Sequence, residues 1–312
     1  MRVFVAGATG AIGARLVPQL VERGHDVIGT TRSPERADRL RALGAEPVVL
    51  DILDRDAVRT AIGAARPDAI VHQATALTGL SDFKHFDRTF AATNQLRTEG
   101  TDALVAAARE HGIDRVVAQS YAGWPYARVG GPVKSEEDPL DPEPAPDMRP
   151  TLTAIEHLEA SVVDQGGIAL RYGGFYGSPD DAQLEPVRKR QFPIVGDGGG
   201  IWSFVHLDDA ASATVLAVER GEPGVYNVVD DDPAPVRDWL PALAAAIGAK
   251  PPRHIPRWLA RFAAGEAAVV LMTEIRGASN AKAKRLLGWN LRYPTWREGF
   301  PASYASHASL AA

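Results

Sequence analysis

The fold of this chain is decided by the stretch Val3-Phe4-Val5-Ala6-Gly7-Ala8-Thr9-Gly10-Ala11-Ile12-Gly13. An apolar run of strand length leads into three glycines, and Leu16, Leu20 and Val21 then recur at helical spacing. Glycines allow a tight turn, a close approach of the backbone to a ligand, and close packing of a helix on a strand. The unbonded amides at the start of such a helix attract a diphosphate. The stretch therefore predicts a strand, a turn and a helix that bind a dinucleotide.

The glycine spacing, Gly-Ala-Thr-Gly-x-x-Gly, resembles the turn of the short-chain dehydrogenase/reductase superfamily, in particular its extended, epimerase/dehydratase-like members. A glycine-rich turn with a purely structural purpose is the alternative, and the flanking strand and helix patterns disfavour it. The resemblance implies a nicotinamide dinucleotide, and the residues that it places against this cofactor are Gly7, Thr9, Gly10, Ala11, Ile12 and Gly13.

Length and composition point to a globular protein that acts on small molecules. The 312 residues suffice for one large core and a smaller lobe, and 45% apolar with 23% charged residues is ordinary for this class. A net charge of −5 gives no support to a nucleic-acid or membrane partner, so we expect a small-molecule substrate and a monomer or homodimer. The absence of cysteine excludes thiolate catalysis and zinc–thiolate sites, and we expect no metal. Without a signal peptide or a membrane-spanning run, a cytoplasmic location is expected.

Strand-like and helix-like segments alternate along the first half of the chain. This alternation predicts an α/β fold with a doubly wound parallel sheet, the Rossmann fold, in which ligands bind at the carboxyl ends of the strands. After the first strand and helix, the predicted strands are residues 26–30, 47–50, 69–72, 115–118 and 168–170, and the predicted helices are residues 34–43, 55–64, 94–111 and about 152–163.

The pattern changes in the second half. Residues 129–150 are acidic and rich in proline, which we interpret as a solvated surface loop. Shorter strands and helices follow Gly177, as expected for a substrate-binding lobe. The predicted division is a dinucleotide-binding domain of residues 1–177, to which residues 207–230 return, and a substrate-binding lobe of residues 178–206 and 231–312.

The end of the second strand bears on the type of dinucleotide. In this fold an acidic residue there binds the ribose 2′-hydroxyl, whereas a basic residue accommodates a 2′-phosphate. Here the strand ends Gly29-Thr30-Thr31-Arg32-Ser33, without a carboxylate. Because Arg32 can bind a phosphate bidentately, with Ser33 beside it, the sequence predicts NADP(H) rather than NAD(H). The alternative is that Arg32 is only an exposed charge that flanks a helix.

Three later strand ends supply further candidate cofactor contacts. The resemblance places Asp51 and Ile52 near the adenine, although Asp51 could equally cap a turn. His72-Gln73-Ala74-Thr75 is similar to a His-x-Ala-Ala/Gly element beside the cofactor, with Gln73, Ala74 and Thr75 as contacts and His72 in the core. The segment 169–177 resembles one that lines the nicotinamide, which adds Tyr172. Residues 203–209, 225–228 and 280–289 also resemble the extended members, so the likeness spans nearly the whole chain.

The catalytic pair of the family is missing. Members carry Tyr-x-x-x-Lys on the helix after the fifth strand and a Glu four residues beyond the Lys. If that Glu is Glu159, Thr151 stands at the Tyr position and Ile155 at the Lys position. In the family the Lys lowers the pKa of the Tyr and holds the nicotinamide ribose. The chain therefore resembles atypical extended members that lack the pair, including polyketide-tailoring ketoreductases.

Substitute catalytic residues are expected at the end of the fifth strand. Tyr121 stands where the family has its substrate-binding hydroxyl residue, and Ser120 precedes it. Alternation along a strand lets at most one of the two face the substrate, and we select Tyr121 as proton donor, with water as the alternative. The interpretation of Tyr121 as a simple aromatic lining stays open. The aromatic residues expected to bind the substrate are Trp124, Tyr126, Phe175 and Trp202.

These features favour an NADPH-dependent ketoreductase that acts on an aromatic or polycyclic carbonyl compound. Because hydride transfer needs no protein group, positioning of the substrate would supply most of the catalysis. A non-enzymatic sensor of NADP(H) is the second hypothesis. A nucleotide-sugar epimerase or dehydratase is the third, and the missing Tyr disfavours it because those reactions need a base for a sugar hydroxyl.

Overall fold

The computed structural model describes residues 1–77, 82–178 and 184–308. Its centre is one sheet of seven strands, all parallel, in the order β12-β7-β5-β4-β1-β2-β3. The reversal of strand order at β1 is the arrangement of the Rossmann fold, so the predicted fold class is confirmed. The strands are β1 (Arg2–Ala6), β2 (Asp26–Thr31), β3 (Glu46–Val49), β4 (Ala69–His72), β5 (Arg115–Tyr121), β7 (Ile168–Tyr172) and β12 (Gly224–Val228).

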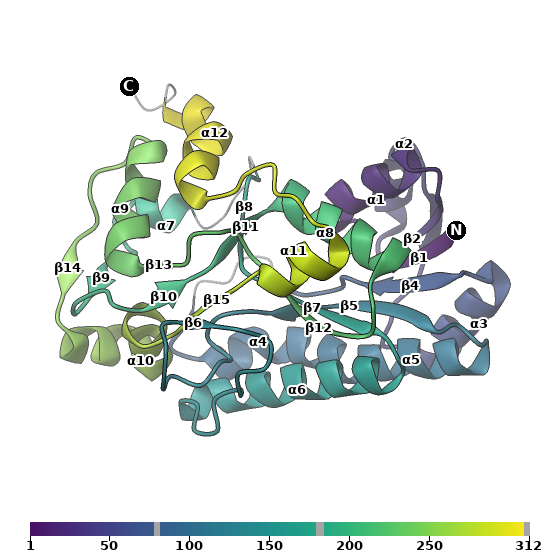
Figure 1. Ribbon diagram of the computed structural model, residues 1–312, viewed down its shortest axis with the longest axis horizontal. Helices are drawn as coiled ribbons and strands as arrows, with labels where there is room; N and C mark the ends of the chain where they lie inside the picture. Colours follow the sequence, from purple (N-terminus) through teal and green to yellow (C-terminus); the bar gives the residue numbers. More distant parts are fainter. Residues whose placement is uncertain (78–81, 179–183, 309–312) are drawn as a thin grey trace.

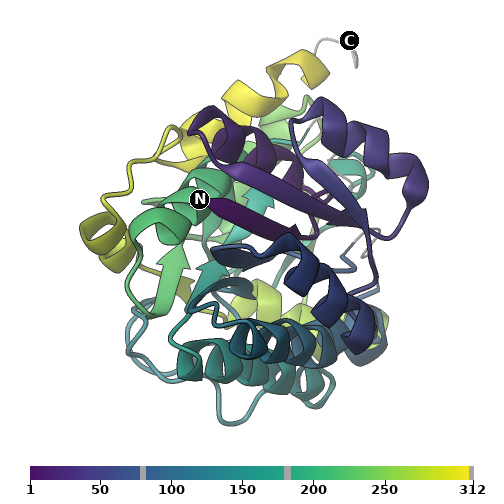
Figure 2. The same ribbon diagram turned by 90° about the vertical axis from the view of Figure 1, so that its right-hand side faces the viewer.

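Helices cover both faces of this sheet (Figures 1 and 2). Alternate residues of β1 point to opposite faces: Val3 and Val5 pack in one core with the helices of the first layer, and Phe4 packs in the other core. The first layer holds α1 (Gly13–Glu22), α2 (Ala37–Ala42, after the 3₁₀ turn η1, Pro34–Arg36), α8 (Leu207–Arg220) and α11 (Ala281–Leu287). The second holds α3 (Arg55–Ala65), α4 (Phe86–Gln95), α5 (Thr101–Glu110) and α6 (Arg149–Asp164), with the 3₁₀ turn η3 (Pro146–Met148) before α6.

Two predicted segments differ from the structure. The helix predicted over 94–111 begins earlier, at Phe86, where α4 starts; a π-helical turn, η2 (Leu96–Gly100), follows α4 and leads into α5. The segment 129–150 is less solvated than expected, because Lys134 is buried and its ammonium group donates to Val129 O and Asp138 Oδ1. A short strand within it, β6 (Val133–Lys134), pairs with β15 (Gly277–Ala278).

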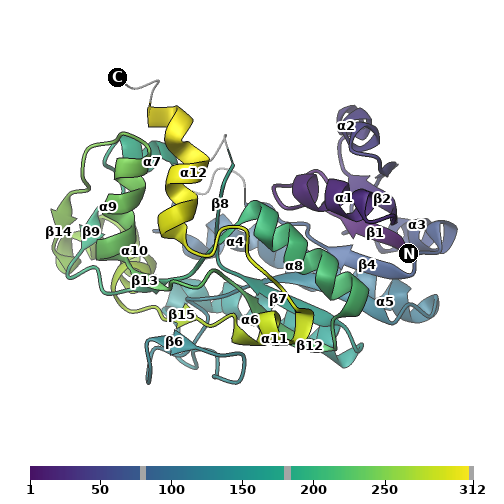
Figure 3. The same cartoon turned by 45° about the horizontal axis from the view of Figure 1, so that its top comes forward.

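The remaining elements form a smaller lobe beyond the carboxyl ends of the strands, at the left of Figure 1 and seen from above in Figure 3. Its core is aromatic, with Trp239, Trp296 and Phe300 buried together. The lobe contains β8 (Gly174–Tyr176), α7 (Leu184–Arg188), β9 (Ile194–Val195), β10 (Ile201–Trp202), β11 (Phe204–His206), β13 (Ala234–Pro235), α9 (Val236–Ala246), β14 (His254–Ile255), α10 (Arg257–Thr273) and α12 (Trp296–Ala308). The structure returns α8 and β12 to the sheet, and the domain boundaries themselves stay a prediction.

Candidate active site

The glycine turn connects β1 to α1 at the carboxyl edge of the sheet. Gly7 has φ +85°, and a Cβ atom on it would lie 2.6 Å from the amide nitrogen of Ala74, so only glycine fits. A Cβ atom on Gly13 would lie 2.4 Å from the carbonyl oxygen of Gly7, which ties the start of α1 closely to the turn. The turn is closed by the Gly10 amide, which donates to the Gly7 carbonyl oxygen at 3.0 Å.

The outer part of the turn fits a dinucleotide phosphate. Gly10 and Ala11 are exposed, Thr9 is half-buried and Ile12 is buried. Within the described chain, the amides of Ala11 and Ile12 donate to no acceptor, and both precede α1. Free amides at a helix N-terminus are the groups that bind diphosphates, so these residues would hold the cofactor there.

Arg32 lies directly after β2 and is exposed. Its side chain forms no ion pair or hydrogen bond within the parts of the chain that the structure describes. Ser33 is already engaged, because its hydroxyl donates to the Glu35 carboxylate, and this hydrogen bond lowers the pKa of Glu35. The carboxylate of Glu35 therefore lies beside Ser33. The sequence prediction considered only the residues up to Ser33 and did not include this carboxylate. The roles of Arg32 and Ser33 toward a 2′-phosphate stay predictions.

The third strand is followed by the candidate adenine contacts. The Leu53 amide donates to Asp51 Oδ1 at 3.1 Å, so the exposed Asp51 caps a turn, as one of the two interpretations expected. Ile52 is buried, and a Cβ atom on Gly100 would lie 2.8 Å from its Cδ1 atom. Ile52 thus connects this loop to the π-helical turn η2, and contact of either residue with adenine stays a prediction.

The segment after β4 contributes buried hydrogen bonds at the carboxyl edge of the sheet. Gln73 is buried and its Nε2 atom donates to the Tyr172 hydroxyl at 3.0 Å, and that hydroxyl also pairs with Thr214 Oγ1 at 2.6 Å. Tyr172 is 0% exposed, which corrects the expectation that it contacts the cofactor: its ring packs in the core. Ala74 and Thr75 are half-buried at the edge, where they could meet a ligand.

Two other predicted site residues, Ser120 and Tyr126, belong to a buried network of ionic and hydrogen bonds. Glu159 accepts from Arg171 Nη2 at 2.6 Å and Nε at 2.7 Å, and from the Ser120 hydroxyl at 2.6 Å. Tyr126 is 0% exposed; its hydroxyl donates to Asn227 Oδ1 and accepts from Arg171 Nη1. The structure therefore corrects the roles of Ser120 in catalysis and Tyr126 in substrate binding, because their hydroxyl groups are already bonded inside the protein.

Tyr121, Trp124 and Trp202 do come together. They share one apolar cluster with buried Phe86 and with Ile155, the residue at the Lys position of the family. This set, the aromatic cluster, lies where β5 ends against the smaller lobe. Phe175 does not join it and packs on Tyr172, with ring centroids 5.4 Å apart. Phe175 is half-buried. Its role in substrate binding, like those of Tyr121, Trp124 and Trp202, stays a prediction.

The positions of the missing pair are filled by packing residues. Thr151 is 1% exposed and its hydroxyl accepts from Asn94 Nδ2 at 3.0 Å. Ile155 is 0% exposed. Neither side chain can exchange a proton with a substrate at neutral pH, so the acid–base unit of the family has no equivalent on α6.

Two groups near the aromatic cluster have shifted pKa values. Burial raises the pKa of Tyr121 to about 12, an effect that the positive charge of Arg97 partly opposes. Burial lowers the pKa of Arg97 to about 10, so the guanidinium remains charged at neutral pH. Arg97 was not predicted from the sequence, because a charged residue within a predicted helix is ordinarily solvated, and only the π-helical turn buries it.

His72 at the end of β4 makes stability depend on pH. It is 3% exposed, its Nε2 atom contacts the Leu96 carbonyl oxygen at 3.2 Å, and burial lowers its pKa to about 4. Because the unfolded chain binds a proton near pH 6.5 and the folded chain does not, stability is full above that pH and falls as the pH drops toward 4. At pH 5 His72 should reduce the free energy of unfolding by about 2 kcal/mol relative to pH 7.

The measurement is urea unfolding at the two pH values. His72→Gln should show a smaller difference than the wild type, whereas the same change at the exposed His254 should leave the difference as it is. Equal pH dependence in His72→Gln and wild type would contradict the assignment.

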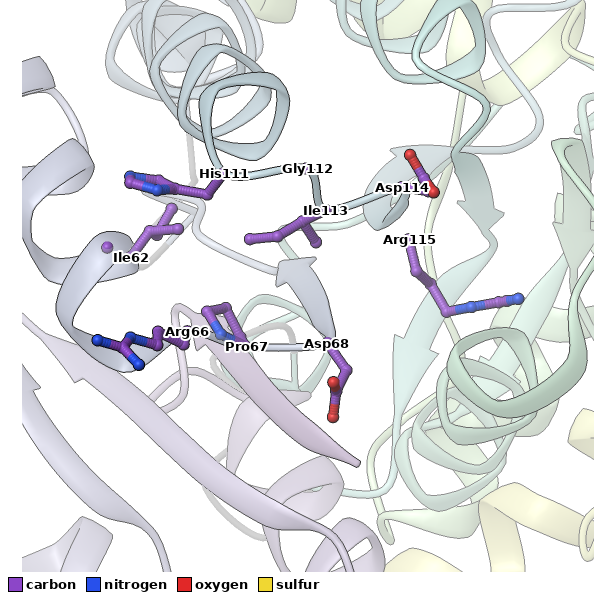
Figure 4. A pocket seen from close by; sticks show the side chains of 10 residues that line it. Ile62, Arg66, Pro67, Asp68, His111, Gly112, Ile113, Asp114 and Arg115 are labelled. Carbon is purple, nitrogen blue, oxygen red and sulfur yellow. The ribbon is translucent and has the colours of Figure 1, made fainter.

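Two hollows at the protein surface lie away from this edge. The larger, of about 630 Å³, lies at the amino ends of β4 and β5. Its lining comes from the end of α3 and the loops before the two strands, and includes Arg66, Asp68, His111 and Arg115 (Figure 4). Arg115 there donates to the carbonyl oxygens of Ala217 and Gly221, so it is a packing residue. The second, of about 410 Å³, lies between α1 and α8. Because ligands of this fold bind at the carboxyl ends, we assign neither hollow to the reaction.

The described residues offer neither a metal centre nor a membrane span. Among them, no group of three or more His, Asp or Glu side chains is arranged to hold a metal ion. In the same part of the chain, every helix is too short or too polar to cross a membrane.

Comparison with known proteins identifies the family. The model of the NAD dependent epimerase/dehydratase family matches residues 3–228. A 3-diazoavenalumate denitrifying reductase from Streptomyces sp is 44% identical, with 96% of this chain and 99% of the relative covered. A 4-hydroxy-2-methyl-3-oxo-4-farnesyl-3,4-dihydroquinoline-1-oxide ketoreductase from Stigmatella aurantiaca is 31% identical over 85% of this chain and 79% of its own. The solved UDP-glucose 4-epimerase of Thermus thermophilus, in complex with NAD, superposes with a TM-score of 0.76 at 25% identity over both full chains. The chain therefore belongs to the NAD dependent epimerase/dehydratase family, the extended short-chain dehydrogenases/reductases.

Proposed function

We propose that the chain is an NADPH-dependent reductase that delivers a hydride to an aromatic acceptor bound at Tyr121. The observation that carries the proposal is the pairing of a retained dinucleotide turn with a dismantled acid–base pair: Thr151 is bonded to Asn94 and Ile155 is buried. When bound, the cofactor supplies the hydride, and the exposed Arg32 would hold its 2′-phosphate. The relatives named as reductases support an oxidoreductase.

One class of acceptor is an aromatic or polycyclic ketone, which the 31% identical ketoreductase supports. As the carbonyl carbon gains a hydride, the carbon–oxygen π electrons move to oxygen, and that oxygen needs a proton. Tyr121 is half-buried at the end of β5, and its raised pKa keeps the hydroxyl protonated at neutral pH. Its proton would pass to the substrate oxygen, and water would then restore the phenol.

The other class of acceptor is an aryl diazo compound, which the name of the 44% identical relative favours. In its diazonium form the ring carbon takes the hydride, the carbon–nitrogen bond breaks, and dinitrogen leaves with the bonding electrons. No proton is transferred in this step, so a site without Tyr and Lys on α6 is chemically sufficient. Aromatic side chains at Tyr121, Trp124 and Trp202 suit a flat ring in both cases.

The test mixes the protein and NADPH with each member of a panel of polycyclic ketones, aryl diazonium salts and UDP-glucose. Oxidation of NADPH is measured as the loss of its nicotinamide absorbance. We expect turnover with one of the two aromatic classes. Tyr121→Phe should slow ketone reduction by roughly 10²–10⁴-fold. At saturating substrate it should leave the rate of diazonium reduction nearly unchanged, because that step uses no proton.

Reactions without protein correct for direct reduction of the diazonium salts. Binding of NADPH without oxidation by any compound would instead support the NADP(H) sensor. Conversion of UDP-glucose would support the epimerase, the activity named for the solved Thermus thermophilus enzyme.

A further inference from the structure

Within the described residues, Arg97 is a buried arginine without a counter-ion. Its side chain lies in the π-helical turn η2 and the residue is 4% exposed. The Nε and Nη1 atoms are buried and have no hydrogen-bond partner among the residues that the structure describes. Within that same part of the chain it forms no ion pair with a carboxylate.

Such a group is costly for the folded protein. A buried charge is ordinarily paired and hydrogen-bonded, because burial removes the water that would solvate it. A buried donor without a partner in the protein calls for an explanation, such as a bound water or ion or a functional role. Single π-helical turns inside α-helices also concentrate at functional sites. These facts point to a ligand group that complements Arg97.

The charges around Arg97 leave its own charge uncompensated. Glu159 on α6 lies within electrostatic range, but it is already held bidentately by Arg171. His72 on β4 is neutral at neutral pH, and the charge of Arg97 contributes to lowering its pKa. Tyr121 on β5 is neutral as well, and the positive charge of Arg97 partly opposes the rise in its pKa. One negative and two positive side chains therefore leave this region with one net positive charge.

Tyr121 connects this charge to the edge of the sheet. Tyr121 is only half-buried, and it stands at the carboxyl end of β5, where ligands of this fold bind. We propose that Tyr121 and Arg97 together bind a negatively charged oxygen of the substrate, an aromatic carboxylate, with the Tyr121 hydroxyl as hydrogen-bond donor and Arg97 as the positioning charge behind it. This deepens the diazonium branch of the proposed function, whose step takes no proton from Tyr121, and it rests on the substrate lying at Tyr121.

The experiment compares a carboxylate with its neutral amide. The NADP⁺-loaded protein is titrated calorimetrically with 2-naphthoate and with 2-naphthamide, which share the ring and differ in charge. The wild type should bind the carboxylate about tenfold more tightly or better, since opposite charges attract strongly in a partly buried region. Arg97→Met should abolish this preference, Arg97→Lys should retain most of it, and Tyr121→Phe should reduce it.

Arg115→Met is the matched control, because Arg115 (Figure 4) stands at the other end of the same strand. Among the described residues its side chain donates to backbone carbonyl oxygens alone. It should leave the preference intact. Equal affinity of the wild type for the two compounds would overturn the proposal even if Arg97→Met does not fold. Loss of NADP⁺ affinity in Arg97→Met with an unchanged carboxylate preference would also overturn it, since Arg97 would then serve a cofactor phosphate. No turnover is needed, so the result is independent of whether the proposed reaction occurs.

Discussion

Glu159→Ala should lower the free energy of unfolding by about 3–5 kcal/mol. Glu159 is 7% exposed and Arg171 is 5% exposed, so water solvates neither charge well. The two short hydrogen bonds between them stabilise both charges in the core. Removal of the carboxylate strands a buried guanidinium beside Tyr126 and takes the hydrogen-bond acceptor from Ser120. Loss of one partner is far more harmful than the net value of the pair, because the remaining charge stays desolvated. The measurement is urea unfolding followed by circular dichroism.

An exposed ion pair provides the control. Arg2 and Glu46 are joined at 3.1 Å, but their side chains are 41% and 66% exposed, so Glu46→Ala should cost less than about 1 kcal/mol. Glu159→Gln should fall between wild type and Glu159→Ala, because it keeps one acceptor oxygen for Ser120. A loss in Glu159→Ala no larger than that in Glu46→Ala would show that Arg171 finds another partner.

The fold was predictable because its signals are local. The apolar run at Val3–Val5 and the glycine turn specify one strand and one helix, and their repetition along the chain specifies the parallel sheet. The register of Glu159 also predicted correctly that no Tyr or Lys stands on α6, since position on a helix follows directly from spacing in sequence.

The environment of each site residue was not predictable in the same way. Ser120, Tyr126 and Tyr172 have hydroxyl groups that suit a ligand, but which hydroxyl is already bonded depends on residues 39 to 101 positions away. The π-helical turn that buries Arg97 has no clear sequence signature, because one extra residue in a turn shifts the helical face without changing composition. Whether one of these hydroxyl groups is bonded in the core or free for a ligand depends on residues far away in the sequence, and not on the type of residue that carries it.

The sharpest expectation from the sequence concerns Arg32, and the expected effect there is large. Arg32→Asp should weaken NADPH binding by roughly 100-fold, since it removes a charge-assisted bidentate contact and places a carboxylate against the 2′-phosphate. Binding of NADH should change much less, because NADH carries a hydroxyl group in place of the 2′-phosphate, and an Asp carboxylate can accept a hydrogen bond from that hydroxyl. The exposed Arg32 forms no bond within the described chain, so its replacement should leave the thermal unfolding temperature nearly unchanged. Calorimetric titration of both cofactors measures the two affinities directly.

Arg39→Asp is the matched control, because it makes the same charge change at an exposed position on α2, seven residues along the chain. It should alter both affinities only slightly, as a surface charge screened by salt does. The Ser33 and Glu35 side chains refine the expectation: since Ser33 donates to Glu35, Glu35→Gln removes a nearby negative charge and should tighten NADPH binding without affecting NADH. If Arg32→Asp and Arg39→Asp weaken NADPH binding equally, the effect is one of net charge, and Arg32 does not recognise the 2′-phosphate.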